Sequence, residues 1–278
     1  MAGFSEVLGV SEFKTKRDSI WKALLAEFVG NIILNYFGCA SCMIIKPNVE
    51  NPNLVLIALT FGFSVFIAVQ AIGHVSGGHI NPAVTIAMLV TRNISLLKAI
   101  LYIIVQCLGA IVGSGLLMAS LPERYHDTAM GVTNLSVPVG NGIVVEIMLG
   151  FILVFTVFGV VDVNKHEIKP IAAFAIGVSV TIGHLATVDY TGASMNPART
   201  FGASVINNHW DDHWVYWVGP IIGGIIAGLL YKYVFAAPST GPLKIIERYT
   251  AVVTDEKEQS NIRTIESDAN FGGAKRSV

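Results

Sequence analysis

The stretches Ser76-Gly77-Gly78-His79-Ile80-Asn81-Pro82-Ala83-Val84 and Thr191-Gly192-Ala193-Ser194-Met195-Asn196-Pro197-Ala198-Arg199 decide the fold of this chain. Each contains the tripeptide Asn-Pro-Ala, and the second copy comes 115 positions after the first. The similarity around the copies keeps that offset, because Gly62-x-Ser64-Val65 matches Gly177-x-Ser179-Val180. Apolar segments interrupted by proline at corresponding places in two halves of a membrane protein indicate a binding site or a pore.

The composition and the grouping of apolar residues predict a membrane protein. The chain has 278 residues, of which 53% are hydrophobic and 13% are charged, whereas about 25% charged residues is usual in soluble domains. Six apolar runs are long enough to cross a bilayer, and a shorter run follows each Asn-Pro-Ala. The long runs lie near Trp21–Ile44, Asn53–Gly73, Leu96–Ser120, Gly142–Val161, Ile168–Thr187 and His213–Phe235, and the short ones at Pro82–Val90 and Pro197–Ile206.

The basic residues are unevenly divided between the two sides of the predicted membrane domain. Of the 18 Lys and Arg residues, all but Lys46, Arg124 and Arg199 fall before the first span, after the sixth, or in alternate loops. Cytoplasmic loops of membrane proteins carry the excess of Lys and Arg. We therefore expect an integral multi-pass protein with both termini in the cytoplasm. As a separate expectation, it lies in the plasma membrane.

The six spans divide into two similar halves, at about residues 20–120 and 141–236. We expect a transmembrane domain at residues 20–236, with a cytoplasmic segment at residues 1–19 before it and a cytoplasmic tail at 237–278 after it. Three spans in each half mean that the second half enters the membrane from the opposite side. The predicted fold is an all-α membrane protein of six transmembrane helices plus two re-entrant half-helices, in an inverted repeat of three plus three.

Few residues suggest covalent or metal chemistry. Cys39, Cys42 and Cys107 fall within apolar runs, so we interpret them as small buried hydrophobes, without a disulfide framework or a metal site. No pairing of a nucleophile with a base is apparent, so we expect no enzymatic activity, no cofactor and no nucleic-acid partner. Asn134-Leu135-Ser136, between the two halves, is a candidate N-glycosylation site on the outer face.

Each Asn-Pro-Ala is predicted to begin a short helix. Asparagine is a strong N-cap residue, and proline suits the first helical position because its missing N–H would be unpaired there. About ten residues follow, or about 15 Å of helix, which is half of the roughly 30 Å hydrocarbon core. Irregular backbone is expected at residues 73–80 and 188–195, and at membrane depth it is tolerated when it is buried or lines a water-filled cavity.

The meeting point of the two half-helices is expected to accept water and to oppose cations. Each helix N-terminus carries roughly half a positive charge, which repels cations, including hydronium. With their side-chain oxygens used as caps, Asn81 and Asn196 would keep their NH₂ donors for a passing water. A water that accepts from both asparagines has no lone pair left for a proton from its neighbour.

The paired Asn-Pro-Ala segments and their flanks resemble the aquaporins, the major intrinsic protein family, over about residues 20–236. The likeness is to the animal, water-selective branch of the family, and we expect an insect source. It implies a passive channel for water, driven by osmotic gradients, that excludes protons and ions. It also implies a homotetramer in membrane lipid, with one pore in each subunit.

The resemblance further implies an aromatic/arginine selectivity filter made by Phe61, His184, Ala193 and Arg199. Water-selective members commonly carry Phe, His, Cys or Ala, and Arg at these positions, whereas glycerol-conducting members typically replace the His with a small residue. From the residues alone, Arg199 is a functional candidate because an arginine at membrane depth is costly. Phe61 alone would be an ordinary lipid-facing or core residue.

Glu27 and Glu146 occupy similar places in the first and fourth spans, one in each half. An intramembrane carboxylate is costly and needs hydrogen-bond partners. We interpret the two as supports that accept hydrogen bonds from the loops beside Asn-Pro-Ala. The rival interpretation is a proton relay of an ion-coupled secondary transporter. The residues also leave open a channel that passes glycerol, urea or peroxide as well as water, and an adhesive or structural membrane protein.

Overall fold

The computed structural model describes residues 8–9, 17–45, 53–126, 130–165 and 170–237, with the side chains of residues 17 and 18 excepted. In this part of the chain six helices are long and apolar enough to cross a membrane, and no strand occurs. They are α3 (Arg17–Ala40), α4 (Leu54–Ser76), α6 (Leu96–Ser120), α7 (Val139–Val161), α8 (Ala172–Thr191) and α10 (Val215–Leu230), which η3 (Tyr231–Phe235) continues as a π-helix. The predicted all-α fold with six spans is confirmed.

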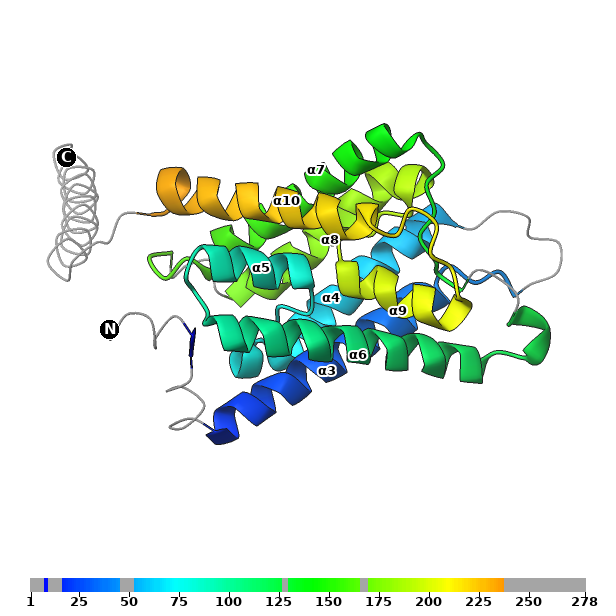
Figure 1. Cartoon of the computed structure of the whole chain (residues 1–278), viewed down its shortest axis with the longest axis horizontal. Helices are drawn as coiled ribbons and strands as arrows, with labels where there is room; N and C mark the ends of the chain where they lie inside the picture. The colour runs from blue at the N-terminus through cyan, green and yellow to red at the C-terminus, as the bar shows by residue number, and fades with distance from the viewer. Residues whose placement is uncertain (1–7, 10–16, 46–52, 127–129, 166–169, 238–278) are drawn as a thin grey trace, which may run out of the picture. The chain divides into compact units, whose positions relative to one another are not determined.

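Two short helices complete the fold, and both begin at the Asn-Pro-Ala prolines. They are α5 (Pro82–Val90) and α9 (Pro197–Asn207). In Figure 1 they point away from each other along one line, so that their N-termini meet in the middle of the bundle. The predicted pair of half-helices is therefore present.

The ends of several helices differ from the expectation. The first was expected to reach Ile44 but ends at Ala40, which leaves Cys42 beyond the helix. The irregular backbone expected from residues 73 and 188 starts later, because α4 and α8 continue to Ser76 and Thr191. Both helices end at a left-handed glycine, Gly77 at φ 96° and Gly192 at φ 75°, whose N–H closes the last turn.

The packing of the helices repeats between the two halves. α3 packs on α6 in the first half, α7 packs on α10 in the second, and α4 packs on α8 where the halves meet. Each short helix packs on the last long helix of the other half, α9 on α6 and α5 on α10 (Figure 1). Because of this exchange, the two Asn-Pro-Ala loops come together from opposite sides.

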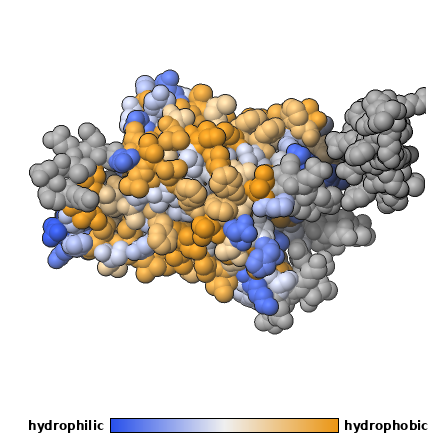
Figure 2. Space-filling view, turned by 180° about the vertical axis from the view of Figure 1, so that it is seen from behind, coloured by the Kyte–Doolittle hydropathy of each residue, from blue (hydrophilic) through white to orange (hydrophobic). Residues whose placement is uncertain are grey.

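The distribution of polar residues is that of a membrane protein. Large apolar side chains are exposed on the outer faces of all six long helices, and Figure 2 shows them over the middle of the visible face, with hydrophilic residues toward its two ends. The interior contains charged and amide side chains instead, including Glu27, Asn31, Asn35, Gln106, Glu146 and Arg199. A first compact unit ends at Ala236, and the second unit, residues 237–278, lies outside the described residues except for Ala237.

Candidate pore and selectivity filter

Both asparagines cap the short helices as expected. The Oδ1 of Asn81 accepts from the N–H of Ala83 at 2.8 Å, and the Oδ1 of Asn196 accepts from those of Ala198 at 3.0 Å and Arg199 at 3.3 Å. Each cap residue has extended backbone and is followed by proline at the helix start. The local sequence is therefore sufficient to explain why the helices begin here.

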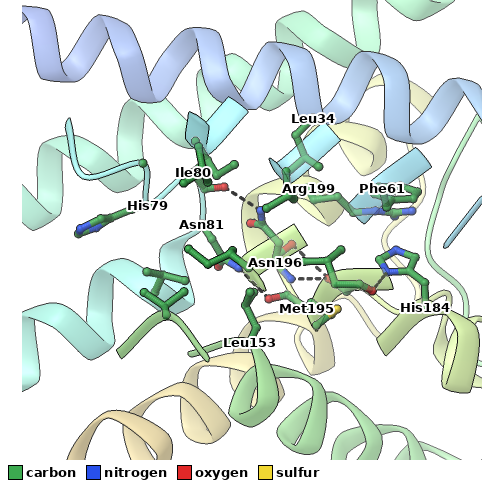
Figure 3. Close-up of a pocket in the computed structure, with 18 residues that line it drawn as sticks. Leu34, Phe61, His79, Ile80, Asn81, Leu153, His184, Met195, Asn196 and Arg199 are labelled. Atoms are coloured by element: carbon green, nitrogen blue, oxygen red, sulfur yellow. Dashed lines mark hydrogen bonds between the residues drawn. The ribbon is translucent and has the colours of Figure 1, made fainter. Parts of the chain in front are cut away.

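The amide groups of the two asparagines also lock the loops to each other. The Nδ2 of Asn81 donates to the carbonyl of Met195 at 2.9 Å, and the Nδ2 of Asn196 donates to the carbonyl of Ile80 at 2.8 Å (Figure 3). An amide NH₂ has two donors, so one N–H of each asparagine is committed to the opposite loop. The expectation that each whole NH₂ group serves the pore is wrong, and one donor of each remains for water.

The carbonyls that accept these bonds belong to residues with unusual backbone. Ile80 has φ 41° and Met195 has φ 56°, a left-handed conformation that is a genuine outlier for a β-branched residue such as isoleucine. Such strain persists only when the surroundings over-determine it, and it occurs mainly at functional sites. Here it turns each carbonyl toward the asparagine of the other half.

A buried carboxylate in each half holds this strained backbone. Glu27 accepts from the N–H of His79 at 2.9 Å and from that of Ile80 at 2.6 Å. The hydroxyl of Ser76 and the amide of Gln106 also donate to it, at 2.7 and 2.8 Å. Both carboxylate oxygens are therefore occupied by donors of the first loop, of α6 and of the last residue of α4.

Glu146 makes the corresponding bonds in the second half. Its two oxygens accept from the N–H groups of Ser194 and Met195, each at 3.0 Å, and from the hydroxyl of Thr191 at 2.7 Å. Both Glu27 and Glu146 are completely buried and do not line the cavity described next. The structure thus brings both carboxylates to the loops that they were expected to support.

A narrow cavity of about 30 Å³ runs past the meeting point of the loops. A water needs at least about 10–15 Å³ of such space, so the cavity has room for water. Its walls are mostly apolar, with Leu34, Val65, Leu153 and Ile176 among them. The polar side chains among its lining residues are those of His79, Asn81, His184, Ser194, Asn196 and Arg199. Figure 3 labels all of these except Ser194.

One end of the cavity is narrowed by an aromatic ring, an imidazole and a guanidinium. The rings of Phe61 and His184 stack with their centroids 4.5 Å apart, and the Arg199 guanidinium lies 4.7 Å from the Phe61 centroid. All three side chains are at least 97% buried. Segments far apart in the sequence, α4, α8 and α9, thus bring three of the four expected filter residues together.

The donors and acceptors of the filter face the cavity. The Nδ1 of His184 contacts the carbonyl of Val180 at 3.0 Å and must donate to it, because a carbonyl only accepts. This leaves its Nε2, and likewise the Nε of Arg199, buried without a partner among the described residues. A permeating water could satisfy both atoms.

Ala193, the fourth expected filter residue, is completely buried beside the second loop but does not line the narrow cavity. Its N–H donates to the Thr191 hydroxyl at 3.1 Å, and its φ of 47° is left-handed. Ala193 therefore contributes to the second loop through its backbone, and its methyl group does not line the cavity.

A wider cavity of about 240 Å³ lies on the other side of Arg199. Cys42, interpreted from the sequence as a buried span residue, instead lines this cavity, as does Asn134. Asn134 is exposed, so the glycosylation sequon is at the rim of the cavity. A glycan there would stand at the mouth of the path rather than on a remote loop.

Sequence reasoning missed several residues that fix the filter and the first loop. The carbonyl of Gly131 accepts from the Nη1 of Arg199 at 2.7 Å, and the Nδ2 of Asn35 donates to the carbonyl of Arg199 at 3.1 Å. Gln106 bridges Glu27 and the Thr85 hydroxyl. Asn35 and Gln106 are amide residues within apolar spans, and this unusual position could have identified them from the sequence. Nothing in the sequence marks Gly131.

Comparisons with known proteins agree with this geometry. A family model described as "Major intrinsic protein" matches residues 14–231. The chain is similar to Aquaporin-4 of Mus musculus, with 49% identity over 222 residues that cover 78% of this chain and 68% of the relative. It is similar to Aquaporin-1 of Canis lupus familiaris, with 38% identity over 257 residues that cover 89% of this chain and 94% of the relative.

A solved structure shares the fold. The aquaglyceroporin from Plasmodium falciparum superposes with a TM-score of 0.68, covering 77% of this chain and 96% of that one, at 22% sequence identity. At this identity the likeness concerns the architecture alone.

Proposed function

Since this chain belongs to the major intrinsic protein family, we propose that it is a water-selective channel that conducts water along osmotic gradients and excludes protons and ions. The observation that carries the proposal is the constriction of Phe61, His184 and Arg199 at one end of a narrow cavity that has room for water. The similar proteins from mouse and dog are both named aquaporins.

Water enters from the wider cavity and meets the constriction first. The unpartnered Arg199 Nε can donate to it, and the His184 Nε2 can accept from it. These bonds replace those of bulk water, while the Arg199 charge opposes cations. The apolar walls beyond offer few competing partners, so that water passes onward without being held.

Protons are excluded at the meeting point of the half-helices. The positive ends of α5 and α9 face each other there, which repels hydronium. Asn81 and Asn196 each keep one N–H for the pore, after the other is bonded to the opposite loop. A water that accepts both remaining N–H groups has no lone pair free to take a proton from its neighbour.

Glu27 and Glu146 support the two loops in this proposal. Every carboxylate oxygen accepts from loop backbone or a neighbouring side chain, and neither residue lines the cavity. This argues against an ion-coupled relay, since an ion would need free carboxylate oxygens on its path.

The finer aspects of the proposal follow the family resemblance. We infer that the chain assembles as a homotetramer with a pore in each subunit, in the plasma membrane. The distribution of Lys and Arg supports cytoplasmic termini, which puts the wider cavity and Asn134 on the outside.

Stopped-flow light scattering of proteoliposomes tests the proposal. We expect fast shrinkage in an impermeant osmolyte and, in a glycerol gradient, no re-swelling faster than that of empty liposomes. Glycerol entry would overturn the selectivity, and water flow equal to that of empty liposomes would overturn the channel itself.

His184→Gly should widen the constriction, because it removes the ring that stacks on Phe61. We expect glycerol and urea to enter proteoliposomes of this variant, while water flow persists. The matched control is His126→Gly, which alters a histidine outside the cavity lining. Unchanged solute exclusion in His184→Gly would refute the role of His184.

A further inference from the structure

Residues 130–133, in the segment that joins the two halves, are fastened along the helix that carries the filter arginine. Met130 donates its N–H to the Asn207 side chain at 3.3 Å, near the far end of α9. The Gly131 carbonyl accepts from Arg199, and the Thr133 hydroxyl is 3.1 Å from that of Thr200. All three attachments are to α9.

The hydroxyl contact is one step of a directional chain of hydrogen bonds. The Ser194 hydroxyl donates to the carbonyl of Asn196 at 3.1 Å, which uses its only hydrogen. Its 2.7 Å contact with Thr200 must therefore be donated by Thr200. Thr200 in turn has no hydrogen left for Thr133, so Thr133 donates to Thr200. The chain connects the joining segment to the second Asn-Pro-Ala loop.

The members of this chain are buried, which makes each bond costly to lose. Thr133, Ser194 and Thr200 are at most 3% exposed. Removing the hydroxyl of Thr133 or Thr200 leaves a buried partner unsatisfied, with the full desolvation penalty of that group. The segment 130–133 would then be held less firmly against α9.

The side chain of Arg199 depends on this segment for its position. Its backbone is fixed separately, by Asn196 at the N–H and by Asn35 at the carbonyl. The guanidinium has one hydrogen bond to protein among the described residues, to the Gly131 carbonyl, and its Nε has none. Displacing that carbonyl would release the guanidinium without unfolding α9.

The Gly131 carbonyl is itself placed by constraints that leave little freedom. Gly131 has φ 71°, a conformation that glycine adopts readily and other residues rarely do. A Cβ added there would lie 2.5 Å from the Cβ of Cys39 and 2.7 Å from its Sγ. The segment is thus seated tightly on α3 on one side and bonded to α9 on the other.

We propose that residues 130–133 form a clamp that positions the Arg199 guanidinium, and that Thr133 and Thr200 thereby determine which solutes the pore excludes. Both are positioning residues, because neither lines the narrow cavity. The predicted effect on solute exclusion rests on the proposed function. The attachment of residues 130–133 to α9 does not depend on transport.

The test compares Thr133→Val, Thr200→Val and the double variant in full-length protein, reconstituted in proteoliposomes. Losing one hydrogen bond should raise the population of released guanidinium about fivefold. The ratio of glycerol to water permeability should rise with it in each single variant. Because Thr133 and Thr200 share one hydrogen bond, the effect of the double variant should be only slightly larger than the larger single effect. Thr133→Ser, which keeps the hydroxyl, should restore the wild-type ratio.

Hydrogen exchange measured by mass spectrometry provides a readout that does not depend on transport. Peptides covering residues 130–136 should exchange faster in both valine variants than in wild type. The control is Thr156→Val, whose hydroxyl bonds, within the described part of the chain, only to the carbonyl of Ile152 in its own helix. It should change neither exchange in this segment nor the permeability ratio.

The outcomes separate the clamp from the proposed function. Unchanged exclusion in both valine variants with wild-type water flow, or additive effects in the double variant, would overturn the clamp. If Thr133→Val does not fold, Thr200→Val decides the matter from the other side of the same bond. Wild-type protein that conducts no water would refute the proposed function, while exchange still decides whether the segment is clamped.

Discussion

Single residues at the centre of this protein hold backbone in conformations that the chain would not adopt alone. The equivalent left-handed residues Ile80 and Met195 present their carbonyls to the opposite asparagines. Each has its N–H bonded to a buried carboxylate. The strain, of the order of 1–3 kcal/mol for each residue, is thus offset by charge-assisted hydrogen bonds, which are about twice as strong as neutral ones.

Replacing Glu146 with Gln should weaken the second loop. The carboxylate accepts three hydrogen bonds. The NH₂ group of a glutamine side chain cannot accept, so it would face one of these donors without bonding to it. We expect a loss of about 1–3 kcal/mol in the free energy of unfolding and slower water flow. Thermal unfolding in detergent measures the loss of stability, with Glu123→Gln on an exposed turn as the control. Equal melting temperatures for the two variants would contradict the support role.

At the scale of elements, the long helices approach closely where small residues face a neighbouring backbone. On α6, a Cβ added at Gly113 would lie 2.7 Å from the carbonyl oxygen of Ile32 on α3. At Gly115, on the same helix, the nearest atom would be at an ordinary 3.6 Å. The close approach of α3 to α6 aligns Glu27 with the first loop and Asn35 with Arg199.

The two α6 glycines give a matched pair of variants. Gly113→Ala should destabilise the protein by about 1–3 kcal/mol, because the methyl group must force the helices apart. Gly115→Ala should be neutral or stabilising by up to about 1 kcal/mol, since alanine favours helix over glycine. Chemical or thermal unfolding of the purified variants compares them. A loss at Gly115 as large as that at Gly113 would show that helix spacing is not the cause.

The connection between α9 and α10 should make stability depend on pH. His213, outside the spans, donates from Nδ1 to Ser204 at 3.1 Å and accepts at Nε2 from the Trp217 indole at 3.0 Å, an arrangement that requires the neutral ring. Burial, and then the nearby His209, lower the pKa of His213 below its ordinary value of 6.5. The unfolded chain therefore binds a proton first, and stability falls as the pH drops below the unfolded pKa.

His213→Gln should flatten this pH dependence, because glutamine can still accept from Trp217 but does not titrate. Melting temperatures between about pH 7 and about pH 5, the range in which histidine changes charge, measure the slope. The wild-type melting temperature should fall more steeply on acidification than that of the variant. Identical slopes would mean that His213 does not contribute.

At the scale of the whole molecule, the sequence predicted the architecture well and the atomic contacts of the site less well. Apolar length and the duplicated motif are local properties, so the six spans and both short helices could be predicted. The crossed asparagine bonds and the Gly131 contact depend on which carbonyls lie opposite after folding. Their partners are separated by 68 or more positions, and no local pattern marks them.

The whole channel is expected to be a homotetramer. Light scattering of the protein in detergent, corrected for the detergent mass, should give about four times the 29.8 kDa of the chain. A stable monomer that conducts water after reconstitution would contradict the tetramer but not the pore, because each subunit contains its own cavity.

Water and proton flux measured on the same proteoliposomes, with a pH-sensitive dye enclosed, would show whether the pore separates the two. We expect fast osmotic water flow together with a proton leak no greater than that of empty liposomes, since the half-helix ends and the asparagine donors break the proton path. Proton flux that rises with protein content alongside water flow would show that the path is not broken.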